Sequence, residues 1–277
     1  DVYKRQLLDG DTSAVDALKK DLAELRNRKI HLLKSAGFPE DYLEPVYDCP
    51  DCKDTGYIGN KKCHCFKKAI IGLLYDQSNI KKFPVEADFS NFRLDYYPVS
   101  HYDKKTGRSS RSMMEDTLRI CHHFIDSFGT EFNNLFFYGD VGVGKTFLST
   151  CIAKEIMNRE YSVLYFSAPQ LFNTLAKNAF DKNDIDAHNM CEYIFDCDLL
   201  IIDDLGTEYT NAFIASQFFT CINERLLHRK STIISTNLSL ESLADLYTER
   251  SFSRITSRYS LLKIVGDDIR IKKKLEH

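Results

Sequence analysis

The sequence predicts an α/β protein whose parallel sheet carries helices on both faces, preceded by a small N-terminal module that combines a helix with clustered cysteines. Apolar runs of strand length alternate with amphipathic stretches from residue 113 onward. The runs are almost continuously apolar, as expected for strands buried on both faces. Of the nine cysteines, four lie between residues 49 and 65, in a segment too short to bury a core of its own.

The composition is that of a folded globular protein. The chain has 277 residues, of which 43% are hydrophobic and 12% aromatic. Its net charge of −3 gives no overall attraction to nucleic acid, so any such contact must come from a local patch. No apolar run approaches the roughly 18 residues of a membrane helix. Because no secretory signal is visible either, we expect a cytoplasmic protein without membrane contact and with reduced cysteines.

The first predicted element is an amphipathic helix over residues 12–35, in which leucines recur at helical spacing. Gly37 and Pro39 end it. Its apolar face either packs on its own module or is offered to a partner protein. We assign residues 1–75 to the N-terminal module, 76–112 to a linker and edge segment, and 113–277 to the main domain.

Two close cysteine pairs predict a zinc site in the N-terminal module. Cys49 and Cys52 form a C-x-x-C knuckle, and Cys63 and Cys65 follow as C-x-C. Glycines between the pairs favour a short hairpin that returns the second pair to the first. Four thiolates would complete a tetrahedral structural site, although His64 could replace one of them. A redox pair would need a βαβ context, which is missing here. Lysines around the cluster form either a solvated face or a DNA contact.

The segments that lead into the main domain are less regular. We expect a helix over 66–83, an aromatic-rich packing segment over 87–98, an exposed basic loop over 99–112 and a helix over 113–128.

A phosphate-binding loop follows the first strand of the main domain. Leu135–Tyr138 is the strand, and the next residues fit G-x-x-x-x-G-K-[ST] at every fixed position. Glycines let backbone N–H groups surround a phosphate chain, Lys145 reaches the β/γ-phosphates, and Thr146 binds Mg²⁺. The helix over 144–159 points its positive end at the anion. The predicted ATP-binding residues are Gly139, Asp140, Val141, Gly142, Val143, Gly144, Lys145, Thr146 and Phe147.

The remaining elements continue the alternation of strand and helix. Strands are predicted over 162–168, 198–205, 231–237 and 261–265, and helices over 169–180, 187–195, 212–229 and most of 240–259. Since the chain ends soon after the last strand, we expect no helical lid domain.

Two carboxylates end the strand over 198–205. Asp203 would hold Mg²⁺, directly or through water, and Asp204 would orient or deprotonate the attacking water. Asn237 ends the next strand, where a polar side chain would lie between that water and the γ-phosphate. The sequence therefore predicts ATP hydrolysis with ATP and Mg²⁺ at the sheet edge.

Arginines follow these acidic residues. Arg250, Arg254 and Arg258 are four residues apart and share one face of a helix. An arginine offered across a subunit boundary stabilises charge on the γ-phosphate, an effect of roughly 10³–10⁵ in rate. Arg270 is a second candidate for contact with the phosphates.

These motifs together resemble the DnaC/DnaI family of bacterial replicative helicase loaders, which is close to the IstB transposition ATPases. The matching pieces are GDVGVGKT, LLIIDDLG, STN, SRI and GDDIR, between Phe89 and Arg270. The resemblance implies a P-loop NTPase of the AAA+ initiator type, with Asn237 as first sensor, Arg254 as arginine finger and Arg270 as a second sensor-like arginine. Many AAA+ proteins carry Asp-Glu where this chain has Asp203-Asp204.

The resemblance also implies partners. It implies ATP-dependent self-association around single-stranded DNA and delivery of a hexameric replicative DNA helicase held by the N-terminal module. Three other functions remain open from the residues alone: a transposition helper ATPase, a P-loop kinase of a small molecule, and a nucleotide-gated binding protein with almost no turnover.

Overall fold

A computed structural model describes residues 13–66, 68–69, 87–181 and 183–276. These residues form two compact units, one ending at Lys61 and the other beginning at Lys62. Most of the helix predicted over 66–83, and the first part of the linker predicted from residue 76, lie outside the described residues. Within the described part, no helix combines the length and the apolar character needed to cross a bilayer.

The first described element of the N-terminal unit is α2, Ser13–Ser35, as predicted. The helix is amphipathic, but Leu33 is the buried leucine along it, whereas Leu18, Leu22, Leu25 and Leu32 are exposed. After it, the short strands β1, Tyr57–Ile58, and β2, Lys61–Lys62, pair into the predicted hairpin.

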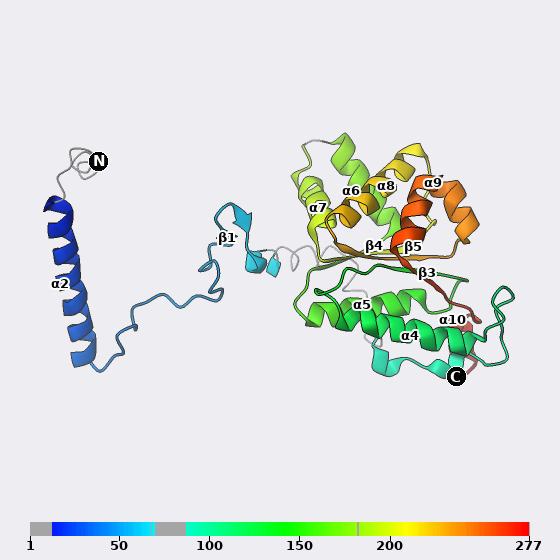
Figure 1. Ribbon diagram of the computed structural model, residues 1–277, viewed down its shortest axis with the longest axis horizontal. Helices are drawn as coiled ribbons and strands as arrows, with labels where there is room; N and C mark the ends of the chain where they lie inside the picture. Colours follow the sequence, from blue (N-terminus) through cyan, green and yellow to red (C-terminus); the bar gives the residue numbers. More distant parts are fainter. Residues whose placement is uncertain (1–12, 67, 70–86, 182, 277) are drawn as a thin grey trace. The chain divides into compact units, whose positions relative to one another are not determined.

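A five-stranded parallel sheet organises the larger unit (Figure 1). Its strands are β3 (Leu135–Tyr138), β4 (Val163–Ser167), β5 (Leu199–Leu205), β6 (Ser231–Thr236) and β7 (Ser260–Lys263), in the spatial order β4-β5-β6-β3-β7. All neighbouring pairs are parallel. Strand β6 therefore separates the strand before the phosphate loop from the strand that carries the two aspartates.

Helices cover both faces of this sheet, which confirms the predicted fold class. The helices α4 (Ser110–Asp126) and α5 (Lys145–Asn158) lie on one face, and α6 (Ala168–Phe180), α7 (Ile185–Asp196), α8 (Ala212–Leu227) and α9 (Leu240–Arg258) lie on the other (Figure 1). Side chains alternate along each strand, so Leu200 and Ile202 enter the core under α6–α9 while Leu199 and Ile201 enter the core under α4 and α5.

Capping residues move two helix starts away from the predicted positions. Helix α4 begins at Ser110 rather than Met113, because the Ser109 hydroxyl accepts a hydrogen bond from the Ser112 N–H. Helix α7 begins at Ile185 rather than Ala187, because Asp184 caps it in the same way. The predicted basic loop is correspondingly shorter.

The C-terminal part of the chain holds two features that periodicity did not indicate. Helix α9 contains a kink at Thr248, whose φ of 76° is unusual for a β-branched residue. After β7 and a short loop, a further helix, α10, spans Ile269–Leu275 with Asp268 as its N-cap. This helix carries Arg270.

A fully buried arginine joins elements at the end of the sheet opposite the phosphate loop. Arg225 on α8 donates to the carbonyl oxygens of Ile194, in the last turn of α7, and of Cys197, which follows that helix. It also donates to the Ser231 carbonyl and the Thr232 hydroxyl on β6. Its side chain thus joins α7 and the residue after it to the start of β6 through hydrogen bonds to buried acceptors.

The central strand should tolerate truncation poorly. Ile234 on β6 is fully buried, so we expect Ile234→Ala to lower the free energy of unfolding by about 2–4 kcal/mol, measured by urea denaturation. Ile185 is 72% exposed, so the control Ile185→Ala should change stability by less than about 0.5 kcal/mol. Equal effects of the two variants would contradict the assignment of β6 to the core.

Candidate nucleotide-binding and catalytic site

A pocket of about 580 Å³ opens at the carboxyl end of the sheet, where parallel α/β sheets place their ligands. It collects residues that the sequence analysis assigned to ATP from four separate segments of the chain. These pocket-lining residues are Val141, Gly142, Gly144, Lys145, Thr146, Phe147, Asp203, Asp204, Asn237 and Arg270. Gly139, Asp140 and Val143 complete the phosphate loop without lining the pocket.

Glycine is required in the phosphate loop because the loop turns tightly against its neighbours. Gly139 has φ 144°, and an added Cβ would lie 2.0 Å from the Ile264 carbonyl oxygen. Gly144 has φ 102°, and its Cβ would lie 2.6 Å from the Tyr97 hydroxyl. Side chains at these two positions would collide with their surroundings whatever their chemistry.

The Lys145 ammonium sits at the mouth of this loop. Its Nζ donates to the carbonyl oxygens of Gly139, at 2.8 Å, and Asp140, at 2.6 Å. Burial lowers the pKa of Lys145, an effect opposed by the nearby carboxylates of Asp204 and Asp203. A buried cation of this kind suits an anionic ligand, because the anion supplies the charge that burial otherwise disfavours.

A β-bulge brings Asp203 and Asp204 to the same pocket. Consecutive residues of a regular strand point to opposite faces, yet both aspartates line the pocket. The register between β5 and β6 shifts between Ile202 and Leu205, so that the two aspartates oppose Ser235. Asp204 takes a left-handed conformation, with φ 54°.

Asp203 is held by hydroxyl groups from three elements. Its carboxylate accepts hydrogen bonds from Thr146 Oγ1, at 3.3 Å, from the Tyr165 hydroxyl, at 2.7 Å, and from the Ser235 hydroxyl. The Ser235 hydroxyl in turn accepts the Asp204 backbone N–H at 3.0 Å. Sequence reasoning missed Tyr165 and Ser235, because each reads as part of an ordinary strand.

The half-buried Asp204 carboxyl differs in its electrostatics. Burial raises the pKa of Asp204, and the neighbouring Asp203 charge raises it further. Lys145 and Arg270 lower the pKa of the same group. A carboxyl with a raised pKa near a bound triphosphate has the properties of a general base that accepts a proton from water.

Polar groups from the next strand and the last helix complete the rim of the pocket. Asn237 lines it directly after β6 ends at Thr236. Arg270 lines it from the first turn of α10, beside the carboxylate of Asp268. A hydrogen bond from the Ile269 N–H to the Gly142 carbonyl, at 3.0 Å, joins the start of α10 to the phosphate loop. Sequence patterning missed α10 although it identified Arg270.

Aromatic side chains also line the pocket and form what we call its aromatic wall. Phe92, Tyr97 and Phe147 line it, and the Phe92 and Tyr97 rings stack with their centroids 5.7 Å apart. The buried Tyr97 hydroxyl donates to the Val143 carbonyl of the phosphate loop at 2.8 Å. Of these residues the sequence analysis assigned Phe147 to the site and treated the aromatic segment over 87–98 as packing. A flat apolar wall beside a phosphate loop suits a nucleobase.

The arginines of α9 lie outside this pocket. Arg250, Arg254 and Arg258 are all exposed, and they follow the kink at Thr248 on one helical stretch. Arg254 therefore does not reach the phosphate loop of its own chain, whereas Arg270 does line its pocket.

The oxygen donors at the loop fit a magnesium ion. The Thr146 hydroxyl and the Asp203 carboxylate lie within 3.3 Å of each other at the first turn of α5. Hard oxygen ligands of this type, together with phosphate oxygens, are those that Mg²⁺ prefers. Bound there, the ion would neutralise charge on the phosphates.

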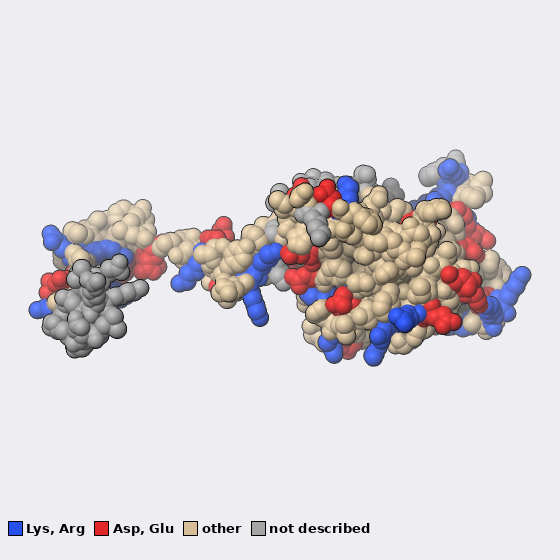
Figure 2. All heavy atoms as spheres, turned by 90° about the horizontal axis from the view of Figure 1, so that it is seen from above, with Lys and Arg blue, Asp and Glu red and all other residues tan. Residues whose placement is uncertain are grey.

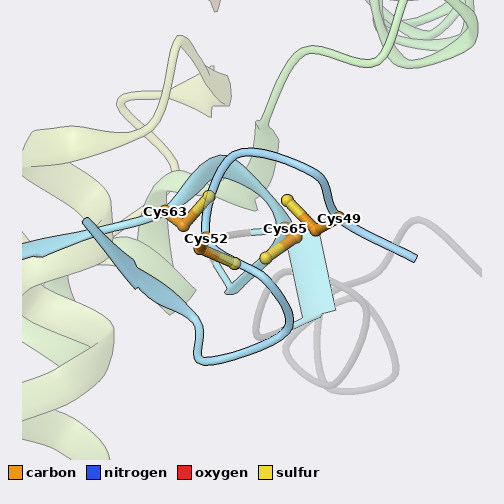
Figure 3. A group of neighbouring side chains, drawn as sticks. All are labelled: Cys49, Cys52, Cys63 and Cys65. Atoms are coloured by element: carbon orange, nitrogen blue, oxygen red, sulfur yellow. The ribbon is translucent and has the colours of Figure 1, made fainter. Parts of the chain in front are cut away.

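The four clustered cysteines form a second candidate centre. The sulfur atoms of Cys49, Cys52, Cys63 and Cys65 all lie within 4.8 Å of one another and turn toward a common centre (Figure 3). Three of the four cysteines are buried. The His64 Nδ1 lies 3.5 Å from the Cys63 sulfur, outside this group of four. Four convergent thiols fit a closed tetrahedral zinc site, with His64 beside it.

Comparisons with known proteins relate this chain to an ATP-binding family. A family model described as IstB-like ATP binding protein matches residues 77–277. The phage-like element PBSX protein XkdC of Bacillus subtilis is 27% identical over 240 residues, covering 82% of this chain and 84% of that protein. The replicative helicase loader DnaI of the same species is 29% identical over 115 residues, covering 41% of this chain and 36% of DnaI.

A solved structure of a helicase loader is also similar to this chain. The crystal structure of the DnaC helicase loader aligns with a TM-score of 0.51 at 26% identity. The alignment covers 63% of this chain and 97% of that one.

The charge around Asp204 should set the acid limb of ATP hydrolysis. Only the ionised carboxylate accepts a proton, so the rate should fall as the pH drops through its raised pKa. Arg270→Ala removes a charge that lowers this pKa, so the acid limb should move to higher pH. Arg270→Lys keeps the charge and should leave the limb in place. A limb unmoved in Arg270→Ala would exclude Asp204 as the titrating group.

Zinc content tests the cysteine centre. We expect about one zinc ion per chain by elemental analysis, and its loss in Cys49→Ser with unfolding of the cysteine segment alone. ATP binding at the phosphate loop should persist. His64→Ala is the matched control and should retain zinc if the four cysteines are the ligands. A Cys49→Ser variant that keeps its zinc would contradict this centre.

Proposed function

This chain belongs to the IstB-like ATP-binding protein family and is an ATPase with the AAA+ fold, and we propose that it loads a replicative DNA helicase onto single-stranded DNA. The observation that carries the proposal is one pocket in which the phosphate loop, two aspartates, Asn237 and Arg270 meet. Relatives named as replicative helicase loaders support the replication role.

Within the pocket, each group receives a role in ATP hydrolysis. The phosphate loop and Lys145 bind the triphosphate, and Thr146 and Asp203 hold Mg²⁺. Asp204 orients the attacking water or takes its proton, and Asn237 lies between that water and the γ-phosphate. Arg270 adds positive charge at the phosphates from α10.

Arg254 acts in a neighbouring subunit. Its exposure on α9, outside the pocket of its own chain, supports a role in trans. ATP bound between two copies would then favour self-association around single-stranded DNA, and hydrolysis would loosen it. Each complete active site would then combine the ATP pocket of one copy with Arg254 of another, so ATP turnover would depend on assembly.

The N-terminal module holds the helicase. The exposed leucines Leu18, Leu22, Leu25 and Leu32 of α2 offer an apolar face suited to a partner protein. We assign residues 1–75 to helicase binding, with zinc as their structural staple, residues 76–112 to the linker, and residues 113–277 to the ATPase domain. The protein acts in the cytoplasm, where the helicase assembles on DNA.

The DNA contact must be local. Lysine, arginine and acidic side chains are interspersed on the face of the larger unit that Figure 2 shows, with broad uncharged areas between them. This face does not attract DNA by its charge alone, and we propose that the DNA contact forms within the ATP-bound assembly.

A loading assay tests the proposal. A hexameric replicative helicase from the same host is mixed with circular single-stranded DNA, which has no end to thread, and helicase retained on the circle is measured. We expect retention with this protein and ATP and none with Lys145→Ala. Equal retention without the protein would overturn the proposal. Transfer of the γ-phosphate to a small metabolite, rather than its release, would indicate the kinase alternative.

Mixing two inactive variants tests the role of Arg254. Arg254→Ala should bind ATP normally yet lose at least about tenfold in turnover, whereas Arg250→Ala, one turn earlier on the same helix, should not. A mixture of Lys145→Ala and Arg254→Ala should regain part of the ATPase rate, because an intact arginine can then serve an intact pocket. No recovery on mixing would exclude a shared site.

A further inference from the structure

We propose that Tyr165 and Ser235 are positioning residues that hold the Asp203 carboxylate in place as a ligand of the magnesium ion. The inference rests on the proposed roles of Thr146 and Asp203 and goes beyond them to residues outside the pocket. Neither Tyr165 nor Ser235 lines the pocket, so neither touches the nucleotide.

The two residues reach the Asp203 carboxylate from different strands. Tyr165 comes from β4 and donates to Oδ2, at 2.7 Å. Ser235 comes from β6 and donates to Oδ1. Because β4 and β6 flank β5 on both sides, the carboxylate is held from each neighbouring strand.

Both donors are buried. Tyr165 is 4% exposed, and its ring belongs to the core under α4 and α5. Ser235 is fully buried. A hydrogen bond to an ionised carboxylate is stronger than one between neutral groups.

Thr146 differs from these two donors because it belongs to the phosphate loop. As a ligand of magnesium, Thr146 would direct an oxygen lone pair at the ion while its proton stays available to Asp203. Tyr165 and Ser235 lie outside the loop and would hold the carboxylate from the two flanking strands. Partners that orient a ligand in this way typically contribute about 10–100-fold to metal affinity or activity.

Ser235 has a second task that Tyr165 lacks. Its hydroxyl accepts the Asp204 backbone N–H at 3.0 Å while donating to Asp203. One hydroxyl therefore supports both the magnesium ligand and the left-handed residue that carries the proposed base. Loss of Ser235 should disturb both roles, whereas loss of the Tyr165 hydroxyl should disturb metal binding alone.

Magnesium titrations of nucleotide binding test this assignment in the full chain. The affinity of a fluorescent ATP analogue is measured at rising Mg²⁺ and in EDTA. For Tyr165→Phe we expect the Mg²⁺ concentration at half effect to rise about tenfold, with the affinity in EDTA unchanged. Ser235→Ala should show the same rise and, in addition, a lower turnover at saturating Mg²⁺.

Tyr247→Phe is the matched control. Tyr247 is also fully buried, and its hydroxyl has no hydrogen-bond partner among the described residues, so its removal should not move the Mg²⁺ midpoint. An unchanged midpoint in both Tyr165→Phe and Ser235→Ala would overturn the inference, as would an equal loss of affinity in EDTA. If binding to the unaltered protein ignores Mg²⁺, the proposed role of Asp203 itself is wrong, a result distinct from the first.

Discussion

The site depends on one local constraint: two consecutive carboxylates must face the same pocket from a strand whose side chains alternate. The bulge at Asp203 and Asp204 meets this constraint by opposing two residues to Ser235. The cost is a left-handed aspartate, a conformation that short polar side chains tolerate better than most. The surrounding strands are buried and regular, so the departure is confined to the catalytic edge.

From that bulge the two acids acquire different chemistry. Asp203 receives three hydroxyl donors and is 6% exposed, which suits a fixed ligand of a cation. The Asp204 side chain is only half-buried. Burial raises its pKa, and the neighbouring Asp203 charge raises it further. Lys145 and Arg270 lower the pKa of Asp204, so two groups that we propose to bind the phosphates also tune the proposed base. In the proposed mechanism, phosphate binding and proton transfer are therefore coupled through charge within one pocket.

Much of the site could be predicted from sequence, because most of its residues directly follow a strand. The phosphate loop, Asp203, Asp204 and Asn237 each come at the carboxyl end of an apolar run, and parallel strands bring such ends together. Tyr165 and Ser235 were missed because a hydroxyl within an apolar strand gives no periodic signal, and their role depends on strand order and a register shift. The aromatic wall and α10 were missed for a related reason, since tertiary contacts rather than patterning place Tyr97 and Ile269 on the phosphate loop. The starts of α4 at Ser110 and of α7 at Ile185 were also missed. Several neighbouring polar residues could cap each helix, and the sequence does not show which of them does so.

The buried Arg225 lies at the other end of the sheet, far from this chemistry. Its donors serve several carbonyls of the chain around α7 and β6, and each carbonyl left unpaired would cost about 1–3 kcal/mol. A loss of that size is a large part of a typical domain's stability, roughly 5–15 kcal/mol. This position is therefore suited to heat-sensitive alleles: cells would lose the protein on warming, while the molecules that remain folded would keep an unaltered catalytic edge. Such alleles would let a geneticist withdraw the ATPase at a chosen moment.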